Sequence, residues 1–84
     1  MGFRIQVSAQ EEFYIIYLNG VLINYFDSTI AMELKIPKGQ YQRILKKHGG
    51  YDSYGNYYFK LAEQAAYAIE ELESIVILNN LIGE

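Results

Sequence analysis

The sequence predicts a single α+β domain, and three patterns support this fold class. Apolar and polar residues alternate over residues 3–8, which is the period of a half-buried strand. Two β-rich segments at 13–18 and 21–26 flank Asn19-Gly20, a pair typical of a tight hairpin turn. Residues 37–48 and 61–74 instead place apolar side chains every three or four positions, as amphipathic helices do.

Residues 1–26 are predicted to form a three-stranded antiparallel meander. If Asn19-Gly20 is a two-residue turn, it sets the register of the hairpin, with Leu18 opposite Val21 and, at the far end, Phe13 opposite Phe26, so that residues 24–26 pair with residues 13–15. Both faces of the hairpin are then apolar, whereas a sheet in a small domain normally has one wet face. We therefore expect a helix or another chain to cover the second face.

Residues 27–59 read as helix, turn, helix and hairpin. Asp27 or Ser28 can cap a short helix over about residues 29–34, and Pro37 suits the first turn of the next helix. That second helix is expected to run over 37–48 and to end at two glycines that accept a left-handed cap. A hairpin over 51–59, the predicted wing, turns near Tyr54-Gly55-Asn56. The apolar stripe of the second helix is Tyr41, Ile44, Leu45 and His48.

Residues 60–84 are predicted to contain a helix from residue 61 to at least residue 74. Residues 75–78 (IVIL) are apolar all round, so periodicity leaves open a buried helix end or a short strand. Either form favours a contact between two copies of the chain, so we expect a homodimer. The predicted apolar stripe of the helix is Ala62, Ala65, Ala66, Ile69, Leu72 and Val76.

Composition limits the class of protein. The 84 residues suit one core, and we find no linker, repeat or domain boundary in 1–84. The absence of cysteine removes disulfides, thiolate nucleophiles and zinc knuckles. Apolar runs are too short to cross a bilayer, and the first residues lack the apolar stretch of a signal peptide. We expect a soluble cytoplasmic protein that does not bind membranes.

Charge is distributed unevenly along the chain. The net charge is -3, but residues 34–60 carry six cations against Asp52 alone, a local net of +5. Nucleic-acid binding requires such a local positive patch and not a positive total, because affinity comes from counterions released at the contacted phosphates. The patch coincides with the polar side of the predicted 37–48 helix. A solvated basic surface without a partner would produce the same pattern.

The order of a short helix, a tight turn with Ile36-Pro37, a basic helix and a glycine-flanked hairpin resembles a winged helix-turn-helix of the excisionase and mercury-resistance-regulator type. The resemblance covers residues 27–59 and implies a small DNA-binding regulator or accessory protein of phage or mobile-element type. In that family the second helix enters the major groove. The residues that this implies for base reading are Gln40, Gln42 and Arg43, and those for phosphate contact are Lys38, Lys46, Lys47 and Lys60. The family's wing is usually basic, whereas the predicted wing of this chain holds Asp52 and four tyrosines.

A second, fainter resemblance, to the arm-binding domains of phage integrases, comes from the strand 57–60 that leads into an alanine-rich helix.

An alternative function is a protein-binding module or inhibitor that uses the Tyr-rich hairpin and a strand edge. Its candidate contact residues are Tyr51, Tyr54, Tyr57 and Tyr58, which could equally pack in the core. His48 is the only histidine and is expected to cap or pack at its helix end. We predict no catalytic residue, because the acidic cluster near residues 70–73 lies on an exposed helix face. We also predict no metal site, because a lone histidine without cysteine cannot build a zinc site, and no cofactor.

Overall fold

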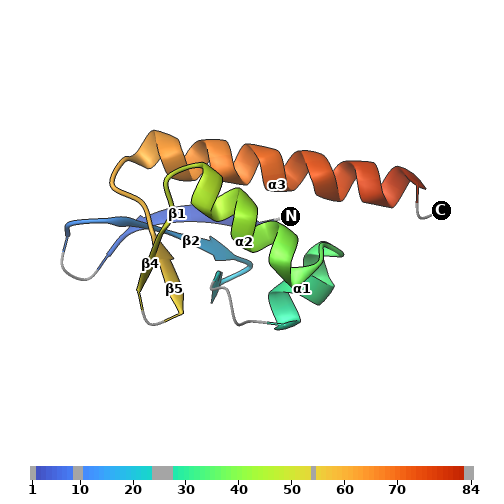
Figure 1. Ribbon diagram of the computed structural model, residues 1–84, viewed down its shortest axis with the longest axis horizontal. Coiled ribbons are helices and arrows are strands. Elements are labelled where there is room, and N and C mark those ends of the chain that lie inside the picture. The colour runs from blue at the N-terminus through green and yellow to red at the C-terminus, as the bar shows by residue number, and fades with distance from the viewer. Residues whose placement is uncertain (1, 9–10, 24–27, 54, 83–84) are drawn as a thin grey trace.

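The computed structural model describes residues 2–8, 11–23, 28–53 and 55–82, with the side chains at 28, 29, 53 and 80–82 left out. It confirms the α+β class and the predicted order of elements (Figure 1). The strands are β1 Phe3–Val7, β2 Tyr14–Leu18, β3 Val21–Leu22, β4 Tyr51–Ser53 and β5 Asn56–Tyr58, and the helices are α1 Ser28–Leu34, α2 Lys38–Lys47 and α3 Ala62–Ile82.

The meander has the strand order β1-β2-β3 and is antiparallel throughout. Asn19 and Gly20 have φ angles of 52° and 83°, both in the left-handed region that a type I′ hairpin turn requires. The predicted register is confirmed, because Leu18 pairs with Val21. The Ile23 N–H also donates to the Ile16 carbonyl at 3.0 Å, beyond the two residues of β3. The pairs predicted for residues 24–26 lie outside the described residues.

The two faces of the three-stranded sheet differ in polarity more than the sequence of the β2–β3 hairpin indicated. The inner face contributes Ile16, Leu18 and Ile23 to the core. On the outer face the Arg4 guanidinium lies 5.9 Å from the centre of the Tyr17 ring. The expectation that a helix or another chain covers the second face considered only β2 and β3, and it left out the polar residues that β1 adds to that face. Arg4 lies opposite Tyr17 in the register, as Gln6 does opposite Ile15.

The helix pair is joined by a three-residue turn. Lys35 has a φ of 56°, and the Ile36 N–H donates to the Ala31 carbonyl at 3.2 Å, so the chain turns sharply before Pro37. Pro37 is the N-cap residue of α2, and its missing N–H would have no helical partner there. The buried side chains of this region are Ile30, Leu34, Ile36, Tyr41, Ile44 and Leu45.

The C-terminal end of α2 has the hydrogen-bond pattern of a Schellman motif. Gly49 has a φ of 94°, and its N–H donates to the Lys46 carbonyl at 3.0 Å. The Gly50 N–H donates to the Leu45 carbonyl at 2.7 Å. The predicted stop at the two glycines is therefore confirmed, and the chain leaves α2 in a fixed direction toward β4.

The hairpin of β4 and β5 is anchored to the meander. Tyr14 of β2 and Phe59, just after β5, exchange two backbone hydrogen bonds of 2.7 and 2.8 Å. Phe59 and Tyr57 are buried in the common core. The backbone bridge and the two buried rings therefore fix the base of the hairpin to the sheet.

The last helix, α3, runs along the sheet and extends past it at the C-terminal end (Figure 1). Residues 75–78 are helical, which answers the question that periodicity left open. Two predicted stripe residues, Ala62 and Ala66, are exposed, and Ala68 is buried in their place, so the buried stripe is rotated from the predicted one. Within the described residues no helix is long and apolar enough to cross a membrane.

Candidate nucleic-acid interface

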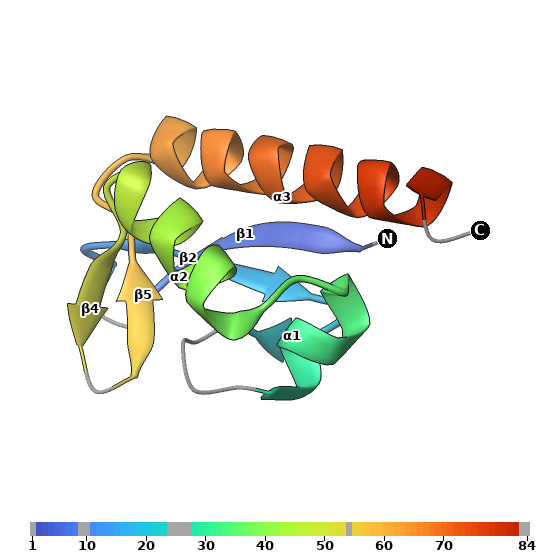
Figure 2. The same ribbon diagram turned by 45° about the vertical axis from the view of Figure 1, so that its right-hand side comes forward.

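The helix α2 lies on one side of the sheet between α1 and the β4–β5 hairpin (Figure 2). Its buried side chains, Tyr41, Ile44 and Leu45, fix the rotation of the helix about its own axis. The opposite side is consequently held outward, with a structural element on each flank. A helix oriented in this way is geometrically able to enter a groove of nucleic acid.

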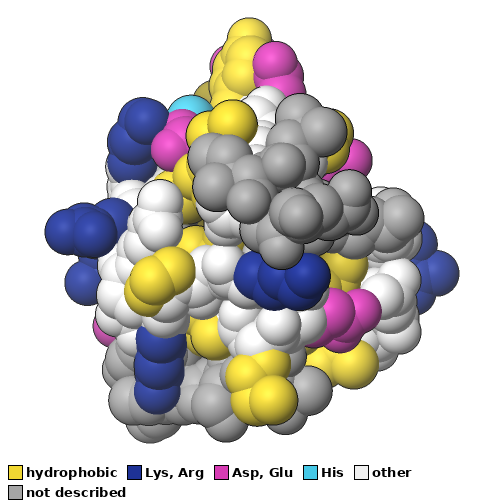
Figure 3. All heavy atoms as spheres, turned by 90° about the vertical axis from the view of Figure 1, so that its right-hand side faces the viewer, with side chains coloured by type: hydrophobic (Ala, Val, Ile, Leu, Met, Phe, Trp, Pro, Cys, Tyr) yellow, Lys and Arg dark blue, Asp and Glu magenta, His cyan; other side chains and the backbone are white. Residues whose placement is uncertain are grey.

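The outward side of α2 is formed by Gly39, Arg43 and Lys46, which are spaced at four and three residues and share one helix face. All three are exposed. Among the described residues, Arg43 and Lys46 form no ion pair. Figure 3 shows Lys and Arg side chains along its left edge, which is the face turned toward the viewer in Figure 1, where α2 lies in front of the sheet; others lie in the middle and at the right edge of the view. We call Gly39, Arg43 and Lys46 the outer face of α2.

The other predicted contact residues differ in accessibility. Gln40 is half-buried beside the outer face, and Lys60 is exposed after the hairpin. Lys38 and Gln42 are half-buried and already interact within the protein. The structure therefore brings Arg43, Lys46 and Gln40 together on α2, whereas Lys60 lies on a separate element.

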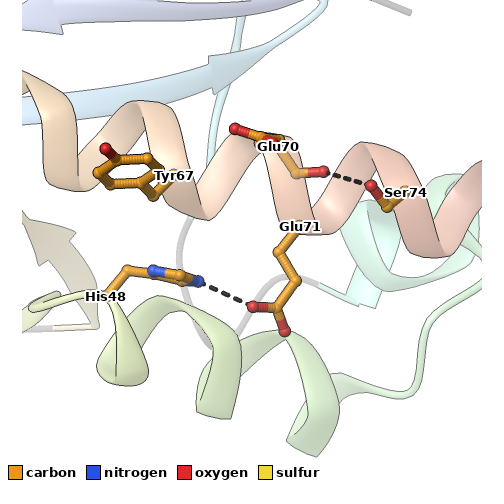
Figure 4. A pocket seen from close by; sticks show the side chains of 5 residues that line it. All are labelled: His48, Tyr67, Glu70, Glu71 and Ser74. Carbon is orange, nitrogen blue, oxygen red and sulfur yellow. Dashed lines mark hydrogen bonds and ion pairs between the residues drawn. The ribbon is translucent and has the colours of Figure 1, made fainter.

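Lys47 is paired within the chain. Its Nζ lies 2.7 Å from Oε1 of Glu71 on α3, and Nε2 of His48 lies 2.8 Å from the same oxygen. Figure 4 shows Glu71 directed from α3 toward α2, with the Tyr67 ring beside His48 and Glu70 pointing away. The two ring centroids lie 6.5 Å apart. The hydrogen bond from Lys47, and then that from His48, lowers the pKa of Glu71.

His48, Tyr67, Glu70, Glu71 and Ser74 line a shallow depression between α2 and α3. His48 has the packing and capping role expected from the sequence, because it is the C-cap residue of α2 and its ring contacts α3. No group of three His, Cys, Asp or Glu side chains in the described part of the chain could hold a metal ion.

The tyrosines of the hairpin do not act as one surface. Tyr57 is 2% exposed, so the predicted partner-contact role for this residue is wrong and its ring belongs to the core. Tyr51 is 55% exposed and stacks on Phe13, with ring centroids 6.1 Å apart. Tyr58, which pairs with Tyr51 across the hairpin, also packs on Phe13, with ring centroids 5.8 Å apart. We call Phe13, Tyr51 and Tyr58 the aromatic cluster. Tyr54 lies outside the described residues.

Sequence reasoning missed three residues of these surfaces. Gly39 could have been found, because it has the same helical phase as Arg43 and Lys46. Phe13 was assigned to a pair with residue 26, and no local pattern connects it to Tyr51. No pattern in the sequence links Glu71 to Lys47, because the two residues lie 24 positions apart.

Compared with protein-family models, with curated proteins and with solved structures, the chain has no significant match. The geometry and charge of the chain itself are therefore the basis for inferring its function.

Proposed function

We propose that this protein is a small, non-enzymatic DNA-binding protein of winged helix-turn-helix type, a regulator or accessory factor of the phage or mobile-element kind. In this proposal α2 enters the major groove, α1 crosses the backbone and the β4–β5 hairpin lies beside the neighbouring phosphates. Such a role fits a cytoplasmic protein.

The outer face of α2 is the observation that carries the proposal. Arg43 and Lys46 are exposed and form no ion pair in the described part of the chain, although the chain as a whole is acidic and acids are available on α3. The helix also packs against α3 and α1, and its buried side chains share a core with Tyr57 of the hairpin. A rigid helix with a cationic outer side matches the requirements of groove recognition.

The proposed roles follow from the chemistry of each side chain. Arg43 can donate two hydrogen bonds to the major-groove edge of guanine, and the Gln40 amide can pair with adenine. Lys46 suits a phosphate contact, which positions the protein without reading sequence. Gln42 and Lys38 would have to give up interactions within the protein first.

Fluorescence anisotropy with mixed-sequence duplex DNA at several salt concentrations tests the proposal. Arg43→Ala should weaken binding and reduce the slope of log affinity against log salt by about 0.9, the value for one phosphate, if Arg43 also contacts the backbone. A base-reading Arg43 should instead cost about 1–3 kcal/mol at its preferred base pair. Arg4→Ala is the matched control, because it removes the same charge from the outer sheet face and should leave binding unchanged. Equal losses in the two variants would refute the proposed interface.

Two copies of the protein would suit the usual pairing of half-sites in DNA. The exposed apolar side chains of the C-terminal part of α3, Ile77 at 59% and Leu78 at 54%, are the proposed contact between copies. Burial of these side chains in a dimer would remove apolar surface from water.

The alternative, a protein-binding module, is favoured by the aromatic cluster. Tyr51 exposes more than half of its surface while it is held by stacking on Phe13, and rigid exposed tyrosine is common in protein interfaces. β1 is also an edge strand of the meander. A protein partner that binds the wild type and Arg43→Ala equally, but does not bind Tyr51→Ala, would support this function over DNA binding.

A further inference from the structure

One oxygen atom connects α3 to the end of the proposed recognition helix. Oε1 of Glu71 receives hydrogen bonds from both Lys47 at 2.7 Å and His48 at 2.8 Å (Figure 4). The Lys47 side chain is 62% exposed, the His48 side chain 20% and the Glu71 side chain 28%. The lysine is thus at the solvent side of this arrangement and the histidine at its inner side.

Because Lys47 is more exposed than His48, the bond from Lys47 to Glu71 is the one that another acceptor can replace. An ion pair that is open to water is weak, because solvent and salt screen it and because the lysine chain loses freedom in holding it. A phosphate offers Lys47 the same kind of charged oxygen acceptor as a carboxylate does. The bond from His48 lies deeper, and it would still satisfy the Glu71 oxygen after Lys47 had left. When Lys47 leaves, the half-buried Glu71 carboxylate therefore still has a hydrogen-bond partner.

We propose that Glu71 is a positioning residue that holds Lys47 in the free protein and releases it to a nucleic-acid phosphate, so that Glu71 sets the affinity of the α2 surface. This inference rests on the proposed DNA-binding function. The Glu71 carboxylate accepts from Lys47 the hydrogen bond that a phosphate would accept. When Lys47 moves from Glu71 to the phosphate, the bond from His48 keeps the carboxylate in place. Lys46, which precedes Lys47 in the sequence, forms no ion pair among the described residues.

The test compares five variants, four single and one double, in anisotropy titrations with duplex DNA over a range of salt. Glu71→Gln keeps an oxygen acceptor for His48 but removes the charge that holds Lys47, so binding should become about 1.5- to 5-fold tighter, the worth of an exposed ion pair. The matched control, Glu70→Gln, removes the same charge from the next residue of α3, which points away from the arrangement, and should change affinity less. Equal tightening in both variants would overturn the inference.

A double-mutant comparison gives a second readout. Lys46→Ala and Lys47→Ala should each reduce the salt slope by about 0.9, as expected for one lost phosphate contact. The loss of affinity caused by Lys47→Ala should be about 1.5- to 5-fold smaller in the wild type than in the Glu71→Gln background, because only in the wild type must Lys47 leave Glu71 before it binds the phosphate. If Lys47→Ala costs the same affinity in both backgrounds, Glu71 does not hold Lys47 and the inference is wrong.

A measurement without DNA separates this inference from the proposed function. In the free protein, Lys47→Met should raise the pKa of Glu71, which carboxyl carbon NMR can follow, since the Lys47 bond is the main cause that lowers this pKa. An unchanged pKa would overturn the inference even where DNA binding is established. Absence of DNA binding by the wild type would instead refute the proposed function, and the inference with it.

Discussion

Replacement of Gly39 by alanine should stabilise the protein and, under the proposed function, weaken its binding to DNA. Where the native backbone suits alanine, glycine lowers stability relative to alanine, because the glycine chain has more conformational freedom to lose on folding. A Cβ at Gly39 would meet no atom within 4 Å, and the residue has no left-handed φ that would require glycine. Gly39→Ala should therefore raise the free energy of unfolding by about 0.4–1 kcal/mol. For a domain of this size the melting temperature should rise by about 2–8 °C.

The same methyl group would project from the outer face of α2, beside Arg43 and Lys46. If this face enters the groove, the added group keeps the helix from its closest approach, so DNA affinity should fall while stability rises. Gly50→Ala is the contrasting control, because its Cβ would collide with the Leu45 carbonyl group, which is backbone and cannot move away at low cost. Thermal unfolding and anisotropy measure the two effects. A lower melting temperature for Gly39→Ala would refute the packing argument, and unchanged DNA affinity would refute the contact.

Three further predictions concern the core, the pH dependence and the dimer. Leu72→Ala should cost about 2–5 kcal/mol in urea unfolding, since the side chain is fully buried, and a loss within experimental error would contradict the described core. The pKa of Glu71 is lowered in the folded state, so its contribution to stability is present above the unfolded pKa and is lost as pH falls through the folded pKa. The stability difference between wild type and Glu71→Gln should accordingly shrink on acidification, and a pH-independent difference would argue against the ion pair. Ile77→Asp with Leu78→Asp should convert a dimer to a monomer in sedimentation, and a wild-type protein that is already monomeric would disprove the proposed contact.

The elements that the sequence predicted well are those with local causes. Asn19-Gly20 determines its turn through the conformations that these two residues tolerate, and Pro37 marks the start of α2 because proline fits only the first turn. The glycines after His48 likewise determine the end of α2 through their own backbone. Each of these signals acts within four residues of the structure that it specifies, so no tertiary information was needed.

The features that the sequence did not predict depend on packing between distant segments. Alternation along β5 indicates that Tyr57 and Tyr58 face opposite sides, but the bridge between Tyr14 and Phe59 decides which side is the core. The rotation of α3, which buries Ala68, likewise depends on the surface that the sheet presents. For the same reason the partner of Lys47 could not be anticipated, since the contact with Glu71 exists only after α2 and α3 have docked.

The bridge between Tyr14 and Phe59 has a consequence for how the chain folds. The bridge closes a loop that contains both helices of the pair and most of the hairpin. The chain must lose the entropy of closing this loop before these two hydrogen bonds can form. The amide protons of both residues should therefore exchange with solvent only when the whole domain opens, at rates set by global unfolding. Neither the meander nor the hairpin is expected to persist as an autonomous fragment after the other is cut away.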